Sequence, residues 1–511
     1  MSFYSILYQA PEDHIGDDSF QAQSFFNDLN CDQIVASITT GKDEYDLKPF
    51  FNTPLHRVGA INYRQEVMRD LEDDALRQCV NAFTQAMREI RDYLLHARKA
   101  HYREQQQAWF LDAVETYCRG IATLTHDLQG LQPKSRGFCE FKEHLTEYIG
   151  SSQFRSLVLD AGRLRADLAA IKYCVHIKGD GFTVRTFQDE ADYSADVEAT
   201  FRKFKQGATR DYTVQFKATE DMNHIEAKIL EFVAKLNSKT FAAMGDFFVR
   251  QADFIDPSIA TFDREIQFYL AYLEYIVPLR HAGLPFCFPR ISEQAGNIYS
   301  DESFDMALAH KLVTEGSIVV RNDFHLSGIE RIIVVSGPNQ GGKTTFARTF
   351  GQLHYLASIG CPVPGLQAEL FLFDRILTHF EKEEKVENLR GKLEDDLERV
   401  HDILNESTSR SLIVLNEIFT STTVHDETFL GGKIMEKILA LGALCAWVTF
   451  VDELASFAPQ VVSMVSTTVP GSPAMRTFKI IRKPADGLAY AVVIAQKYRL
   501  TYGAIKERIR S

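Results

Sequence analysis

Residues 337–344 read Gly337-Pro338-Asn339-Gln340-Gly341-Gly342-Lys343-Thr344, and the fold of the second half of the chain can be inferred from them. This stretch matches the phosphate-binding loop pattern G-x-x-x-x-G-K-[ST] at every fixed position. An apolar, strand-like run precedes it at 332–335, and a helical run follows it at 345–353. Glycines let backbone N–H groups turn towards phosphate oxygens, and a helix N-terminus adds the positive end of a dipole. The order of strand, loop and helix therefore predicts a nucleotide site, and it disfavours a chance match in a glycine-rich turn.

Each part of this loop has an expected role. Lys343 would contact the β- and γ-phosphates, and the Thr344 hydroxyl would hold Mg²⁺. The predicted nucleotide-binding residues are Gly337, Pro338, Asn339, Gln340, Gly341, Gly342, Lys343, Thr344 and Thr345.

A second polar motif ends another apolar run. Ser411-Leu-Ile-Val-Leu415 is followed directly by Asn416 and Glu417. In nucleotide sites such a strand normally ends in Asp, which supports Mg²⁺, and then Glu, which orients or deprotonates water. We expect Asn416 to support the metal without adding charge, and Glu417 to be the catalytic carboxylate. The alternative is an ordinary core strand with capped polar residues.

The two halves of the chain differ in their periodicity. The first 300 or so residues have apolar stripes at helical spacing, as in 76–94, 157–171 and 225–236. Residues 174–185, with Gly-Asp-Gly at their centre, predict a β-hairpin between long helices. Prolines and glycines between 278 and 300 indicate a domain junction. Beyond it, short apolar runs at 317–321, 331–336 and 411–415 predict buried parallel strands of an α/β domain.

Composition excludes several classes of protein. The chain has 511 residues, 45% hydrophobic and 24% charged, and a net charge of −13. These values exclude a collagen-like or mostly disordered chain, and any nucleic-acid site must be a local basic patch.

The longest apolar run, Ile438–Val451, is too short to span a membrane and predicts a helix end, a turn and a strand. The eight cysteines form no C-x-x-C pair and no signal peptide is evident, which indicates reduced thiols in a cytoplasmic protein.

Several motifs in order resemble those of the MutS family of ATPases. The loop at 337–345 resembles that family's G-P-N-M-G-G-K-S-T, and Asn416-Glu417-Ile418 resembles its D-E-I. Further similar segments are Tyr63–Leu71, Gly360–Pro364, Asp374–Thr378, Thr422–Asp426 and Val448–Leu454. The resemblance covers about residues 50–511 and is strongest in the last 200.

The resemblance implies both a fold and a function. It implies a multidomain protein: an N-terminal segment (1–50), a mostly α-helical core, lever and clamp region (51–300), and an α/β P-loop (ABC-type) ATPase domain with a C-terminal dimerisation helix (301–511). It further implies ATP and Mg²⁺ as cofactors, a homodimer, and double-stranded DNA enclosed by the clamp, as in repair or recombination of mismatched or branched DNA. The hairpin at 174–185 would lie at a clamp tip.

Four basic residues near that hairpin are candidate DNA contacts. Arg202, Lys203, Lys205 and Arg210 lie in one short stretch without an acidic residue. Phosphate contacts need such local positive charge. A solvated helix face is the alternative.

Some positions depart from the family pattern. Residues before about 50 leave no room for a mismatch-reading domain, Phe450 stands where the family has a switch His, and Gly391 lies near the position of a serine that reaches the partner's nucleotide. Lys392 could supply a positive contact there, and Asp396 stands where relatives have Glu. These departures keep two alternatives open: a nucleotide-gated scaffold with negligible hydrolysis, or an ABC-type ATPase acting on a non-DNA partner.

Overall fold

The computed structural model describes residues 3–13, 23–179, 181–188, 222–381, 391–469, 472–485 and 500–510. The chain divides into two compact units. Unit 1 comprises Met1–Phe3, Asp73–Pro133 and Cys139–Asp263, and unit 2 comprises Tyr4–Glu72, Lys134–Phe138 and Arg264–Ser511. The domain limits expected from the sequence, at 50 and 300, stay a prediction.

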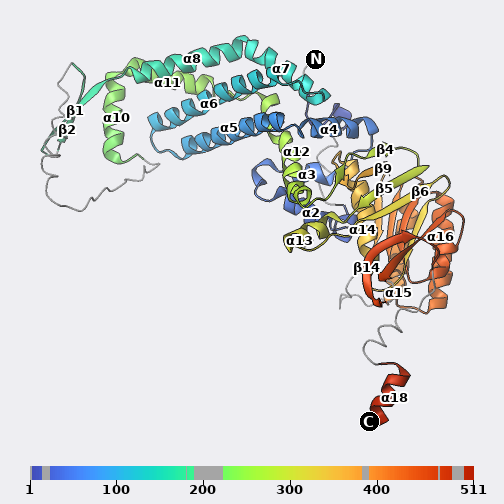
Figure 1. Ribbon diagram of the computed structural model, residues 1–511. Coiled ribbons are helices and arrows are strands. Elements are labelled where there is room, and N and C mark those ends of the chain that lie inside the picture. The colour runs from blue at the N-terminus through green and yellow to red at the C-terminus, as the bar shows by residue number, and fades with distance from the viewer. Residues whose placement is uncertain are drawn as a thin grey trace. The chain divides into compact units, whose positions relative to one another are not determined.

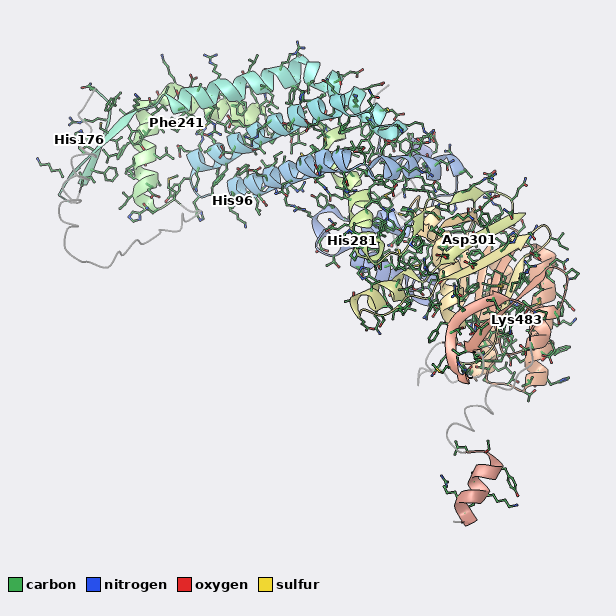
Figure 2. All side chains as sticks on the ribbon, viewed as in Figure 1. His96, His176, Phe241, His281, Asp301 and Lys483 are labelled. Atoms are coloured by element: carbon green, nitrogen blue, oxygen red, sulfur yellow. The ribbon has the colours of Figure 1, made fainter. Side chains whose placement is uncertain are left out.

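Unit 1 consists mainly of long helices, and it contains a β-hairpin between α8 and α10. Its elements are α5 (Asp74–Lys99), α6 (Arg103–Gly130), α7 (Arg136–Gly150, whose first residues belong to unit 2), α8 (Ser152–Ala169), β1 (Tyr173–Lys178), β2 (Gly181–Thr186), α10 (His224–Leu236), α11 (Ser238–Arg250) and the start of α12 (Pro257–His281). Helices α5, α6, α8 and α11 lie side by side (Figure 1). His176 on β1 and Phe241 on α11 are labelled in Figure 2.

The sequence explains where these helices begin and which faces they bury. Asp73 caps α5, because its side chain accepts from two backbone N–H groups of the first turn. The stripe predicted over 76–94 packs inward, with Leu76, Val80 and Phe83 among its buried members. The predicted hairpin is confirmed as an antiparallel pair in which Tyr173 faces Thr186.

Unit 2 begins with short helices that pack against its α/β part. They are η1 (Pro11–Asp13), α1 (Phe25–Asp28), α2 (Cys31–Thr39), η3 (Asp43–Tyr45), α3 (Lys48–Asn52) and α4 (Val58–Asp70). Arg64 on α4 is fully buried and donates to the backbone oxygens of Leu7 and Ile359. The N-terminal segment, α4 and the end of helix α14 (Lys343–Ser358) are thus joined through one side chain.

The centre of unit 2 is a six-stranded sheet in the order β10-β11-β12-β7-β13-β14. Its strands are β10 (Ile376–His379), β11 (Leu412–Asn416), β12 (Leu444–Val448), β7 (Ile332–Ser336), β13 (Val461–Val469) and β14 (Ser472–Arg482). The first five are parallel and β14 is antiparallel to β13. The parallel α/β architecture predicted for this half is confirmed, as are the strands predicted at 331–336 and 411–415.

Helices α14, α15 (Lys392–Glu406) and α16 (Val424–Leu441) and the 3-10 helix η4 (Asp452–Ser456) connect these strands in the chain. The three α-helices are labelled in Figure 1. The run 438–451 behaves as predicted: α16 ends at Leu441, Gly442 turns with a φ of 76°, and β12 follows. Among the described residues, no helix is long and apolar enough to cross a membrane.

A second, four-stranded sheet has the order β4-β9-β5-β6. It contains β4 (Arg290–Ser292), β9 (Gln367–Phe371), β5 (Asn297–Ser303) and β6 (Asn322–Ser327); a small pair joins β3 (Phe286–Cys287) to β8 (Val363–Pro364). Helix α13 (Met306–Thr314) precedes β6, and α18 (Tyr502–Arg510) is the last element.

The strand predicted at 317–321 is wrong. Those residues form no strand, and Ile318 is 88% exposed. The strand lies a few residues later at β6, where buried Phe324 and Leu326 alternate with exposed neighbours. A sheet with one covered face selects this alternation over a continuous apolar run.

Candidate functional site

The glycine-rich loop joins the buried strand β7 to the N-terminus of α14, as the sequence predicts. Gly337 and Gly342 have φ values of 115° and 90°, a region that favours glycine. A Cβ on Gly341 would lie 2.9 Å from the backbone oxygen of Pro338 and would also meet Ser466. The loop can follow this path only because these positions carry no side chain.

Ser466 on the neighbouring strand β13 fixes the loop from the side. Its hydroxyl is fully buried and donates to the backbone oxygen of Gly341 at 2.7 Å. Arg476 on β14 donates through Nε to the backbone oxygen of Asn339 at 3.1 Å. Asn339 and Gln340 are exposed at the outer side of the loop, whereas Pro338 is buried.

Lys343 is the first residue of α14, and its side chain is almost fully buried. Its ammonium donates to the backbone oxygens of Gly337 and Pro338 at 3.1 and 3.2 Å, and it lies 4.3 Å from the centre of the Phe450 ring. Burial lowers the pKa of Lys343 from its ordinary value, and the nearby Glu417 carboxylate opposes that shift. The loop therefore encloses the Lys343 ammonium, which is stabilised by two backbone oxygens of the loop and by the face of the Phe450 ring.

Asn416 and Glu417 lie at the same edge of the sheet as the glycine-rich loop. Strand β11 is separated from β7 by β12 alone, and the three are parallel, so their carboxyl ends meet. Glu417 Oε1 lies 3.8 Å from Lys343 Nζ, and the Glu417 side chain keeps about a quarter of its surface exposed. The geometry brings together the residues that the two separate motifs singled out.

The polar groups of this edge suit a magnesium ion bound together with phosphate oxygens. Thr344 is half-buried in the first turn of α14, and Thr345 follows it. Asn416 is buried, and its Oδ1 has no hydrogen-bond partner within the described part of the chain. Hydroxyl and amide oxygens are ligands that Mg²⁺ accepts, directly or through water. Over the same residues, no group of three or more His, Cys, Asp or Glu side chains could hold a metal ion.

Two further groups of residues were singled out from the sequence. Arg202, Lys203, Lys205 and Arg210 fall outside the described residues. Gly391 is the N-cap of α15, and Lys392 beside it forms an ion pair with Glu381.

Two contacts near the site, those of Ser466 and His379, were not predicted from the sequence. Ser466 belongs to a strand that no motif marked, so its contact with the loop had no signal in the sequence. His379 is buried at the end of β10, where its Nε2 lies 3.0 Å from Oδ1 of Asp396 on α15. Asp396 was singled out as a departure from the family pattern, but its partner was not.

The protein is thus multidomain, with a helical unit and an α/β unit. At one edge of its sheet, the α/β unit carries a glycine-rich loop, a buried lysine and a nearby carboxylate. Residues 333–500 match the family model for MutS domain V. This match assigns that part of the chain, which holds the glycine-rich loop and Glu417, to a MutS-family domain.

Individual relatives agree with this assignment. The DNA mismatch repair protein MutS of Chlorobium phaeovibrioides is 28% identical over 53% of this chain and 31% of its own length. The Endonuclease MutS2 of Gemmatimonas aurantiaca is 28% identical over 38% of this chain and 24% of its own. MutS of Dehalococcoides mccartyi is 33% identical over 30% and 19%. The similarity thus spans less than a third of each of these relatives.

Proposed function

We propose that the α/β part of unit 2 is an ABC-type P-loop ATPase that binds ATP and Mg²⁺ in the glycine-rich loop. The observation that carries this proposal is the buried Lys343 ammonium, enclosed by the loop and 3.8 Å from the Glu417 carboxylate. A triphosphate is bound by a cation together with backbone N–H groups, which a glycine-rich loop before a helix N-terminus can supply. The match of residues 333–500 to MutS domain V supports it.

Different residues of the site would bind phosphate, hold the metal ion and activate water. The backbone N–H groups of 337–345, Pro338 excepted, and the Lys343 ammonium would bind the phosphates, and Thr344 and Asn416 would hold Mg²⁺, directly or through water. Bound Mg²⁺ would neutralise charge on the phosphate oxygens. Glu417 would orient the attacking water and accept its proton.

We further propose that the chain is an ATP-dependent clamp on double-stranded DNA that acts as a homodimer in DNA repair or recombination. Relatives that are named as a mismatch repair protein and an endonuclease support this role. Closure of two ATPase domains on ATP would be passed to unit 1, and Arg202, Lys203, Lys205 and Arg210 would contact DNA phosphates. The preference for mismatched or branched DNA belongs to this proposal.

The test is ATP turnover with and without duplex, branched and mismatched DNA. Lys343→Ala should abolish turnover, whereas Lys433→Ala, which removes an exposed lysine paired with Glu436, should leave it unchanged. Equal turnover by wild type and Lys343→Ala would refute the assigned site. DNA affinity that fails to weaken as salt rises would refute phosphate contacts.

One observation favours a second candidate, a nucleotide-gated scaffold with negligible hydrolysis. Phe450 covers the Lys343 ammonium with an aromatic face and has no proton to donate to a phosphate. Asn416 also brings no negative charge to the metal. Tight retention of ATP without phosphate release would select the scaffold over the ATPase.

A further inference from the structure

His379 and Asp396 form a buried pair next to the turn that contains Glu417, the proposed catalytic carboxylate. His379 ends β10, the strand next to β11, and it is 1% exposed. Its Nε2 is 3.0 Å from Asp396 Oδ1, and Asp396 is 6% exposed. Burial of a carboxylate is costly and needs polar contacts to compensate for lost water. The contacts of the second carboxylate oxygen therefore indicate what the pair supports.

The turn directly after β11 has an unfavourable backbone. Glu417 and Phe419 have φ values of 53° and 63°, in the left-handed region that non-glycine residues avoid. Ile418 and Phe419 are both buried. Such a conformation persists only where the surroundings enforce it. Because Glu417 is part of this turn, the turn sets where its carboxylate points.

Two of the backbone N–H groups of the turn donate to partners outside it. The Glu417 N–H donates to the backbone oxygen of Val448 at 2.9 Å. The Phe419 N–H donates to Asp396 Oδ2 at 3.3 Å. Asp396 is the side chain that links the turn to α15, and its other oxygen faces His379.

We propose that Asp396, which lies beside His379, is a positioning residue that fixes the turn of residues 417–419 and so orients the Glu417 carboxylate towards the attacking water. This inference rests on the proposed ATPase function. A carboxylate suits the role because its two oxygens accept from the turn and face the histidine at the same time. Catalytic groups displaced by about 1 Å lose up to about 100-fold in rate, so a support of this kind affects catalysis without touching substrate.

Helix α15 also contacts Thr420, the residue that follows the turn. The Lys392 ammonium lies 3.5 Å from the Thr420 hydroxyl, and it also pairs with Glu381. The first turn of α15 and Asp396 thus both face residues 417–420. A displacement of α15 would therefore change the position of Glu417.

The experiment compares variants at Asp396 with a matched control. Asp396→Ala removes both contacts, and Asp396→Asn keeps one acceptor oxygen in a side chain of the same size. Asp374→Asn is the control, because Asp374 accepts from Thr408 and Ser411 at the opposite end of β10 and β11. We would measure kcat and KM for ATP, and hydrogen exchange of the peptide that contains residues 417–420.

Asp396→Ala should lower kcat about 10- to 100-fold with KM for ATP changed less than about threefold, and should speed exchange of the turn amides. Asp396→Asn should recover part of kcat, and Asp374→Asn should keep the wild-type kcat. Wild-type kcat in Asp396→Ala, or an equal loss in Asp374→Asn, would overturn the positioning role while leaving the ATPase intact. Wild-type turnover no higher than that of Lys343→Ala would instead overturn the ATPase function itself, and the positioning role with it.

Discussion

The Ser466 hydroxyl is the side-chain contact that ties the glycine-rich loop to β13, and its removal should weaken ATP binding. It donates to the backbone oxygen of Gly341 at 2.7 Å from a fully buried position. Ser466→Ala leaves that oxygen without this partner and leaves the side chain's apolar contacts nearly unchanged. The loop then loses a constraint on the conformation in which its N–H groups would face phosphate.

The size of the effect follows from the burial of both groups. A buried acceptor left unsatisfied costs about 1–3 kcal/mol, and a neutral hydrogen bond contributes about 1 kcal/mol net. A loss of about 1–2 kcal/mol in the binding-competent loop corresponds to a rise in Kd for ATP of about 5- to 30-fold. The free energy of unfolding of unit 2 should fall by a similar amount.

Ser463 provides the matched control on the same strand. It lies three residues earlier on β13, and its Oγ has no hydrogen-bond partner within the described ranges. Ser463→Ala should leave the Kd for ATP unchanged. Titration calorimetry with ATP and Mg²⁺ on both variants gives the comparison. An equal Kd for wild type, Ser463→Ala and Ser466→Ala would show that this contact does not shape the nucleotide site.

Three further predictions concern packing and pH. Gly341→Ala should raise the Kd for ATP by about 5- to 150-fold through about 1–3 kcal/mol of overpacking, because the new Cβ would lie 2.9 Å from a backbone oxygen; calorimetry would measure it. Arg64→Met should lower the free energy of unfolding by about 2–6 kcal/mol in urea titrations, because the oxygens of Leu7 and Ile359 each lose a donor. Burial raises the pKa of Glu265 from 4.5 to about 7, so the folded state binds a proton that the unfolded state has lost, and stability should fall by about 3 kcal/mol as pH rises from 4.5 to 7. Glu265→Gln should flatten that dependence, and a slope equal to that of wild type would contradict it.

Local patterns were sufficient for much of the fold. The strand before the glycine-rich loop, the helix after it and the strand that ends in Asn416 all lie where the sequence places them. Each depends on neighbours within a few residues: an apolar run, a turn that needs glycine, a helical start. The resemblance to MutS proteins added an order of motifs that no single pattern supplies, and the match to domain V confirms it.

Patterns were less informative where burial depends on a distant partner. The stripe predicted on α10 includes Ile225 and Leu236, yet both are exposed, and Ala227 and Val233 are the buried residues. The helical period was right, but the covered face is decided by what packs against it. Within the described residues, α10 contacts β2 and α11.

The contacts that shape the candidate site were out of reach for a related reason. Ser466 and Gly341 are 125 residues apart, and Asp396 on α15 and Phe419 in the turn after β11 are 23 residues apart. A motif identifies Gly341 because the loop's own backbone restricts it, but nothing local restricts Ser466. Ser466 acquires its role only because β13 pairs with β7, which brings its hydroxyl to the backbone oxygen of Gly341 inside the core. Residues of this kind gain their role from the order of strands, and the order of strands is a property of the whole sheet.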